Sequence, residues 1–176
     1  MLAIVMVLFS VLASLPFMLD GDVSNQQQTA LDDAIAQTLV MQYQAALTVC
    51  SAASPPAGCS AGSSSDIDTS TALPDDIANA PLIRSGLVVA HMDTSSRIVA
   101  FVDETQRSTN IANHALWGQV SASLIANSGG AAGVGFWLSS SGQIQGAQGS
   151  STYVIAGTQG RHQLLNGNPI IVQSNP

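Results

Sequence analysis

The feature that most constrains this chain is its first 49 residues, which divide into two segments. Residues 1–19 form an almost unbroken apolar run without a charged side chain, and residues 20–22 interrupt it with Asp-Gly-Asp. A run of this length is at the short end of what spans a hydrocarbon core of roughly 30 Å. We therefore predict a transmembrane anchor at residues 1–19, followed by an amphipathic helix at residues 20–50.

Two other interpretations of the apolar run stay open. The first is a cleaved signal peptide, for which Val11-Leu12-Ala13 offers a small-residue cleavage pattern, although no positively charged stretch precedes the run. The second is a buried core helix, which needs apolar surroundings on every side and is hard to accommodate in so small a domain. The membrane anchor is the interpretation that the residues favour.

The distribution of charge around the run predicts its orientation. Basic residues prefer the cytoplasmic side of a membrane, yet no arginine or lysine precedes Arg84. The acids Asp20 and Asp22, directly after the run, resist a cytoplasmic placement. We expect the rest of the chain to lie outside the inner membrane, which in a bacterial cell means the periplasm.

The charge composition excludes several classes of partner. Lysine is absent, the four arginines are outnumbered by 11 acids, and the formal net charge is −7. Such a chain has little with which to neutralise a row of phosphates or to adhere to anionic lipid heads. Neither a lysine-containing phosphate loop nor a dinucleotide-binding glycine loop in its strand-to-helix context is present. We therefore expect no nucleic acid, no cofactor and no small-molecule substrate.

The amphipathic helix is predicted from a stripe of apolar residues spaced four apart. Ser24 fits the N-cap, with Gln27 as its capping-box partner. The stripe consists of Leu31, Ile35, Leu39, Tyr43 and Leu47. Two interpretations apply: the favoured one packs the stripe on the chain's own domain, and the other presents it to a helix of another subunit.

The two cysteines of the chain flank the end of this helix. Cys50 and Cys59 are separated by eight residues, within a loop at residues 51–74 that is rich in Ser, Gly, Pro and Ala. In an oxidising compartment such a pair predicts a disulfide. A redox-active pair would be spaced Cys-x-x-Cys, and a zinc site would need further ligands nearby. We treat residues 51–74 as a disulfide loop and linker.

Residues 75–176 carry the signals of a small α+β domain. Residues 86–92 and 97–104 predict a hairpin with a four-residue turn, and Asp75-Asp76 predict the start of a turn or a helix. Ser108 or Thr109 is predicted to cap one further helix that ends at Asn127. Further strands are predicted at residues 134–138, 143–145, 152–156 and 170–173. The expected fold is a long N-terminal helix followed by an antiparallel sheet with one more helix.

No group of residues forms a recognisable catalytic motif. Serine lacks the Gly-x-Ser-x-Gly context, and the absence of lysine rules out Ser-x-x-Lys. His91 shares a strand face with Asp93, which is a weak metal signal. His114 is expected on a helix surface and His162 in a glycine-rich loop. An anchored periplasmic hydrolase using a serine with His91 or His162 is kept as a minor hypothesis.

The overall layout resembles type IV pilins and pilin-like proteins: an apolar anchor, an amphipathic helix, a loop and a small α+β domain. Pilins carry a basic leader, a processing site after glycine and a glutamate at the fifth mature position, none of which is found here. The chain is more similar to the PilM family of thin-pilus (type IVb) operons on conjugative plasmids. The similar segments are residues 40–46, 124–130, Val134-Gly135, residues 141–144 and the late Asn-Pro followed by Ile-Ile-Val.

The resemblance implies a structural function without catalytic residues. We expect an inner-membrane component of thin-pilus assembly or of the basal body, acting in conjugation. Its expected partners are other pilus-assembly proteins or the pilin. The alternative within the same class is a minor pilin-like subunit that enters the fibre.

Overall fold

The computed structural model describes the backbone of residues 2–60, 62–109, 117–129, 131, 133–156, 158–159 and 161–172. Within these ranges, side chains are described except those of residues 2–24, 108–109, 151–153 and 158.

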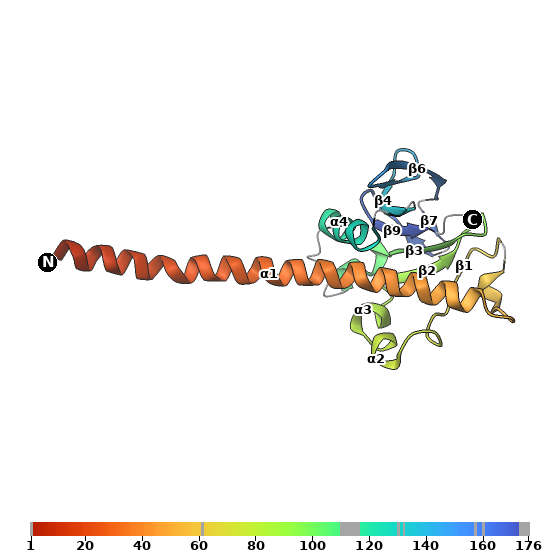
Figure 1. Ribbon diagram of the computed structural model, residues 1–176, viewed down its shortest axis with the longest axis horizontal. Coiled ribbons are helices and arrows are strands. Elements are labelled where there is room, and N and C mark those ends of the chain that lie inside the picture. Colours follow the sequence, from red (N-terminus) through yellow and green to blue (C-terminus); the bar gives the residue numbers. More distant parts are fainter. Residues whose placement is uncertain are drawn as a thin grey trace.

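The N-terminal segment forms one continuous helix, α1 (Leu2–Cys50), whose first part extends beyond the domain (Figure 1). The polar residues 20–22 do not interrupt it. The predicted N-cap at Ser24, with Gln27 as partner, is therefore wrong: the turn before Ser24 is already helical and supplies carbonyls to the amides that a cap would satisfy. The predicted end of the helix at Cys50 is confirmed.

Among the residues with described side chains, no helix is long and apolar enough to cross a membrane. The predicted anchor at residues 1–19 lies outside that part of the chain.

The domain is built on a seven-stranded sheet with the order β1-β2-β3-β9-β4-β5-β6. Its strands are β1 (Ser65–Asp66), β2 (Val88–Met92), β3 (Ile98–Val102), β4 (Val134–Leu138), β5 (Gln143–Gly146), β6 (Gly149–Val154) and β9 (Pro169–Val172). All its pairings are antiparallel, as predicted. The C-terminal strand β9 lies at the centre, so the sheet closes only when the end of the chain inserts between β3 and β4.

The predicted hairpin is formed by β2 and β3, with Met92 opposite Ile98. Every residue of both strands is buried. Because successive side chains of a strand point to opposite faces, both faces of this hairpin are covered. The continuous apolar composition of the two strands follows from this double burial.

One face of the sheet packs under α1 and α4 (Trp117–Asn127), which lie side by side (Figure 1). The buried residues of this layer are Ile35, Ala36, Leu39, Leu82, Leu87, Val88, Ala100, Val102, Trp117, Val120, Leu124, Val134 and Ile171. A second layer on the opposite face consists of Val89, Val99, Phe101, Trp137, Ile144, Ile155, Leu164, Ile170 and Val172. The α+β fold with a long N-terminal helix and an antiparallel sheet is thus confirmed.

Several short elements complete the fold beyond the one further helix that was predicted. They are the 3-10 helices η1 (Ala57–Cys59) and η2 (Glu104–Thr109), the helices α2 (Asp75–Ala78) and α3 (Pro81–Arg84), and a two-stranded sheet of β7 (Thr158–Gln159) and β8 (His162–Gln163). Of the turn or helix predicted to start at Asp75-Asp76, the structure shows the helix, α2. Ser108 and Thr109 belong to η2, and residues 110–116, which include His114, lie outside the described part.

Candidate functional site

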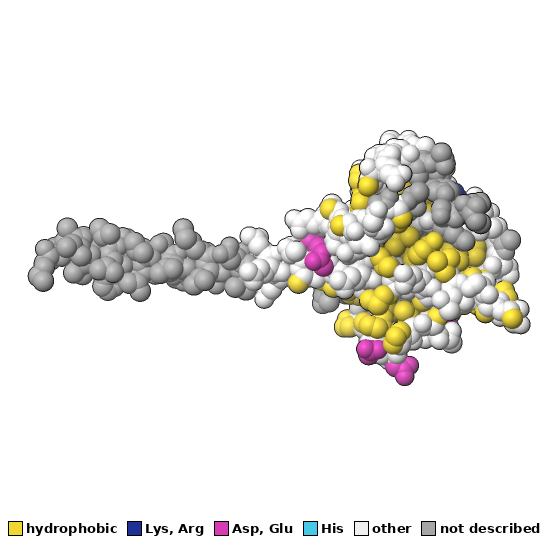
Figure 2. All heavy atoms as spheres, viewed as in Figure 1, with side chains coloured by type: hydrophobic (Ala, Val, Ile, Leu, Met, Phe, Trp, Pro, Cys, Tyr) yellow, Lys and Arg dark blue, Asp and Glu magenta, His cyan; other side chains and the backbone are white. Residues whose placement is uncertain are grey.

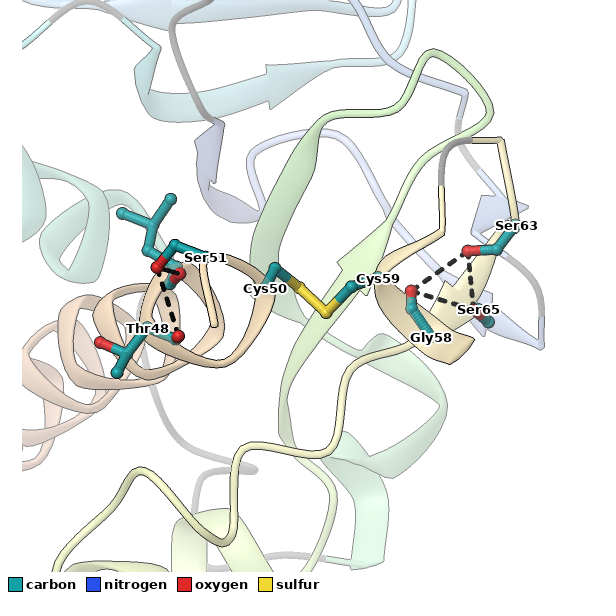
Figure 3. Close-up of a disulfide and its surroundings, with 8 residues drawn as sticks. Thr48, Cys50, Ser51, Gly58, Cys59, Ser63 and Ser65 are labelled. Carbon is teal, nitrogen blue, oxygen red and sulfur yellow. Dashed lines mark hydrogen bonds between the residues drawn. A yellow bond between two sulfur atoms is a disulfide. The ribbon is translucent and has the colours of Figure 1, made fainter. Parts of the chain in front are cut away.

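The predicted disulfide is present. Cys50 and Cys59 are bonded, with their Cα atoms 5.3 Å apart, so the last residue of α1 is tied to η1 (Figure 3). The loop that follows is not a simple linker, because β1 within it pairs with β2 through Ser65 and Met92. Ile67, next along the chain, is buried against Ala46 of α1. The disulfide therefore fixes the end of the long helix to the edge of the sheet.

Close backbone packing supports the disulfide on its η1 side. The Gly58 carbonyl accepts hydrogen bonds from the hydroxyls of Ser63 and Ser65 at 3.1 and 3.2 Å (Figure 3). A Cβ at Gly58 would lie 2.7 Å from the Asp66 carbonyl oxygen. Only glycine therefore allows η1 to approach β1 this closely.

The predicted helix stripe faces the chain's own domain. Ile35 and Leu39 are 0% exposed within the layer under α1. Leu31 and Tyr43 are partly buried against that layer, and Leu47 packs beside the disulfide. This is the packing that the favoured interpretation expects, and the fully buried members leave no surface for a helix of another subunit.

A buried histidine lies between two carboxylates at the edge of the sheet. His162, on β8, has Nδ1 2.7 Å from Asp103 Oδ2 and Nε2 2.8 Å from Asp66 Oδ1. The side chain of His162 is 5% exposed and that of Asp103 is 2% exposed, whereas Asp66 is 39% exposed. Three segments that are distant in sequence therefore meet at one ring: β1, the end of β3, and β8.

Two further side chains extend this cluster around Asp66. His91, on β2, has Nδ1 3.1 Å from Asp66 Oδ1 and is 1% exposed. Arg161 donates to Asp66 Oδ2 at 3.1 Å from the solvent side, with a side chain that is 81% exposed. We call Asp66, His91, Asp103, Arg161 and His162 the histidine–carboxylate cluster.

The hydrogen-bond contacts of His162 limit its ability to act as a general base. An ionised carboxylate only accepts hydrogen bonds, so a ring nitrogen that contacts one must carry a proton. Both nitrogens of His162 contact carboxylates, and the imidazolium form satisfies both contacts at once. In that form the ring has no lone pair with which to take a proton from a serine hydroxyl. The geometry therefore does not favour His162 as the base of a hydrolase.

The carboxylates of the cluster are held in their ionised form. Burial alone raises the pKa of Asp66, but hydrogen bonds from His91 and His162, with the charges of His162 and Arg161, outweigh burial and lower it. Burial likewise raises the pKa of Asp103. Hydrogen bonds from His162, from Thr105 and from the Gln163 and Thr105 backbone amides outweigh it and leave the pKa below its ordinary value. The ionised carboxylates of the cluster are therefore in direct contact with basic side chains.

The sequence pattern did not identify this cluster. Asp93, which the pattern paired with His91, instead accepts hydrogen bonds from the Arg97 side chain at 2.9 and 2.7 Å. In the part of the chain that the structure describes, no group of three or more His, Cys, Asp and Glu is arranged to hold a metal ion. Asp66 and His162 lie 96 positions apart, and no local spacing signals their contact.

Comparison of the chain with protein-family models, with curated proteins and with solved structures finds no match in any of the three. The function is therefore argued from the geometry of this chain.

Proposed function

We propose that this chain is a non-enzymatic, membrane-anchored component of thin-pilus assembly in conjugation, with its domain in the periplasm. The observation that carries the proposal is that one helix, α1, contains both the apolar run and the residues that form the domain core. An anchor built in this way joins the domain directly, without a flexible linker.

The dimensions of α1 support an anchoring role. The domain buries α1 residues from Asp32 onward, and Figure 1 shows the helix extending beyond the domain on its N-terminal side. At 1.5 Å per residue, the 19 residues of the apolar run correspond to about 28 Å of helix, close to the roughly 30 Å of a hydrocarbon core. On this proposal the apolar run is just long enough to cross a membrane while the rest of the same helix stays in the domain.

The domain surface supports a function carried by contacts between proteins. Figure 2 shows a face of mostly uncharged polar and apolar side chains, with few acidic groups. Within the domain, a disulfide and the contact between buried His162 and Asp103 join segments that are distant in sequence. This composition suits packing against other pilus-assembly proteins or the pilin, the partners that the resemblance to the PilM family implies.

A second candidate within the same class is a pilin-like subunit of the fibre. It is favoured by the helix that extends from an antiparallel sheet domain, which is the layout of pilin-like proteins. The two candidates differ in the location of the protein: an assembly component stays in the membrane, whereas a fibre subunit becomes part of the pilus.

Fractionation of conjugative donor cells tests the proposal and separates the candidates. With an epitope tag after residue 176, the assembly role predicts that the chain stays in the membrane fraction after a carbonate wash and is missing from sheared pili. Recovery of the chain in sheared pili would favour the fibre subunit. Release of the chain by carbonate from cells that make normal pili would overturn the membrane-anchored role.

A further inference from the structure

The few cationic side chains of this acidic protein divide into two pairs. Arg97 donates two hydrogen bonds to Asp93 and is 11% exposed. Arg107 donates to Glu104 at 3.0 Å and lies over the Trp117 ring, 4.6 Å from its centroid. Both guanidinium groups are therefore bound within the domain.

The other two arginines are directed to a common pocket. Arg84, at the end of α3, is exposed, and its guanidinium group has no hydrogen bond to any residue that the structure describes. Arg161 is bound to Asp66 and is otherwise open to solvent. Both line one pocket of about 390 Å³. The remaining lining residues are Ser85, Gly86, Asp103, Thr105, Gln106 and His162.

Asp103, in the wall of this pocket, already accepts hydrogen bonds at both of its carboxylate oxygens. Asp103 Oδ2 accepts from His162 Nδ1 and from the Thr105 hydroxyl, each at 2.7 Å. Its Oδ1 accepts from the backbone amides of Thr105 and Gln163 at 3.1 and 3.2 Å. The pocket therefore offers guanidinium donors while its carboxylate is occupied, a combination that favours an anion over a cation.

We propose that this pocket binds a carboxylate group held between Arg84 and Arg161. Guanidinium groups match carboxylates in bidentate geometry, and each such hydrogen bond is charge-assisted. The negative charges of Asp66 and Asp103 nearby favour a singly charged ligand over a doubly charged phosphate. The site follows from the pocket alone and does not depend on the proposed function.

Two sources supply this chemistry: a free carboxylic acid, or an Asp or Glu side chain of a partner polypeptide. A second copy of this chain offers such a group, because Asp75 and Asp76 are both exposed at the start of α2. A second copy also carries a net charge of −7, so this contact requires the local attraction of Arg84 and Arg161 to exceed the overall repulsion between the two copies.

Side-chain NMR of the full chain in detergent micelles tests the site. With four arginines in the sequence, the arginine Nε region holds four signals. Titration with acetate at pH 6.5 should shift the Arg84 and Arg161 signals in a saturable manner and leave those of Arg97 and Arg107 in place. A blocked peptide with the sequence of residues 73–78 probes the polypeptide source. Tighter binding of this peptide than of acetate identifies a polypeptide carboxylate as the ligand, and the reverse identifies a free acid.

Two variants and one competing anion make the test decisive. Arg84→Gln removes an exposed side chain without a described bond, so the fold should persist while carboxylate affinity falls at least five-fold. Gln44→Glu, on the exposed side of α1, changes the net charge equally and should leave the affinity unchanged. Non-saturating shifts of all four signals would overturn the site. Tighter binding of inorganic phosphate than of acetate would overturn the assignment of a carboxylate.

Discussion

His162 Nδ1 lies 2.7 Å from Asp103 Oδ2, although the two residues are 59 positions apart in the chain and both side chains are buried. Their contact ties β8 to the end of β3, and Asp66 continues the link to the edge strand β1. The contacts of His162 therefore hold three distant segments together, and replacing this residue should lower the free energy of unfolding.

Replacing His162 by alanine should lower the free energy of unfolding by about 3 kcal/mol, because the buried Asp103 carboxylate then loses the hydrogen bond from the His162 ring. Urea denaturation of the full chain at pH 7 measures the change. Arg161→Ala is the matched control one residue away, and because its side chain is 81% exposed it should cost less than about 1 kcal/mol. Equal losses in the two variants would show that burial of the pair contributes nothing.

The lowered pKa values of Asp66 and Asp103 predict a loss of stability in acid. The folded chain releases these protons more readily than the unfolded chain, so the contribution of the two carboxylates is complete above their ordinary pKa of 3.8. It is lost as the pH falls through the lower folded values. The urea midpoint should therefore drop more steeply between pH 4 and pH 2 for the wild type than for Asp103→Asn. An identical slope in both proteins would contradict the charged state of the cluster.

Gly135, on β4, should tolerate no side chain. A Cβ there would lie 2.7 Å from the carbonyl carbon of Gln145 and 2.9 Å from the Gly146 Cα, both backbone atoms of the neighbouring strand. Gly135→Ala should thus cost about 3 kcal/mol, the upper range for overpacking. Gly118→Ala in α4, where a Cβ meets nothing within 4 Å, should instead stabilise by up to about 1 kcal/mol. Thermal denaturation compares the two variants, and a stable Gly135→Ala protein would disprove the close strand approach.

The disulfide should contribute about 2–3 kcal/mol by closing a short loop in the unfolded chain. Replacing Cys50 and Cys59 together by serine should lower the unfolding free energy by that amount, and reducing agent should then have no further effect. Mass spectrometry of protein from the cell envelope should find the two cysteine peptides linked under non-reducing conditions. Two free thiols would contradict both the bond and the oxidising compartment.

The parts of the fold that were predictable are those with a local pattern. The four-residue spacing of Ile35 and Leu39 predicts a helix packed on its own domain, and both residues lie at the centre of the core. Hairpin β2–β3 is likewise predictable from two short β-branched runs and the turn between them.

Features that depend on distant contacts were not predictable. Strand β1 is two residues long and is defined by its pairing with β2, not by its own composition. The cluster around His162 depends on the position of β8 beside the end of β3, a contact between residues 59 positions apart. The sequence around Asp66 is rich in serine and does not indicate that the Asp66 carboxylate accepts hydrogen bonds from two buried histidines.

One local prediction within α1 was wrong, although the long N-terminal helix itself was expected. Ser24 follows the polar residues Asp20-Gly21-Asp22 and is a good capping residue by composition, so an N-cap was predicted there. The helix nevertheless runs through both. Helix propensity is a weak local preference, about 1 kcal/mol for a glycine, and the helical turns on either side override it.

The most direct test of the central claim is deletion of this gene from a conjugative donor strain, with thin pili counted by electron microscopy and mating measured in liquid. We expect loss of pili and of liquid mating while the pilin level stays unchanged. The full chain should restore both, whereas residues 20–176 alone should not. Normal piliation and normal liquid mating in the deletion strain would contradict a role in thin-pilus assembly.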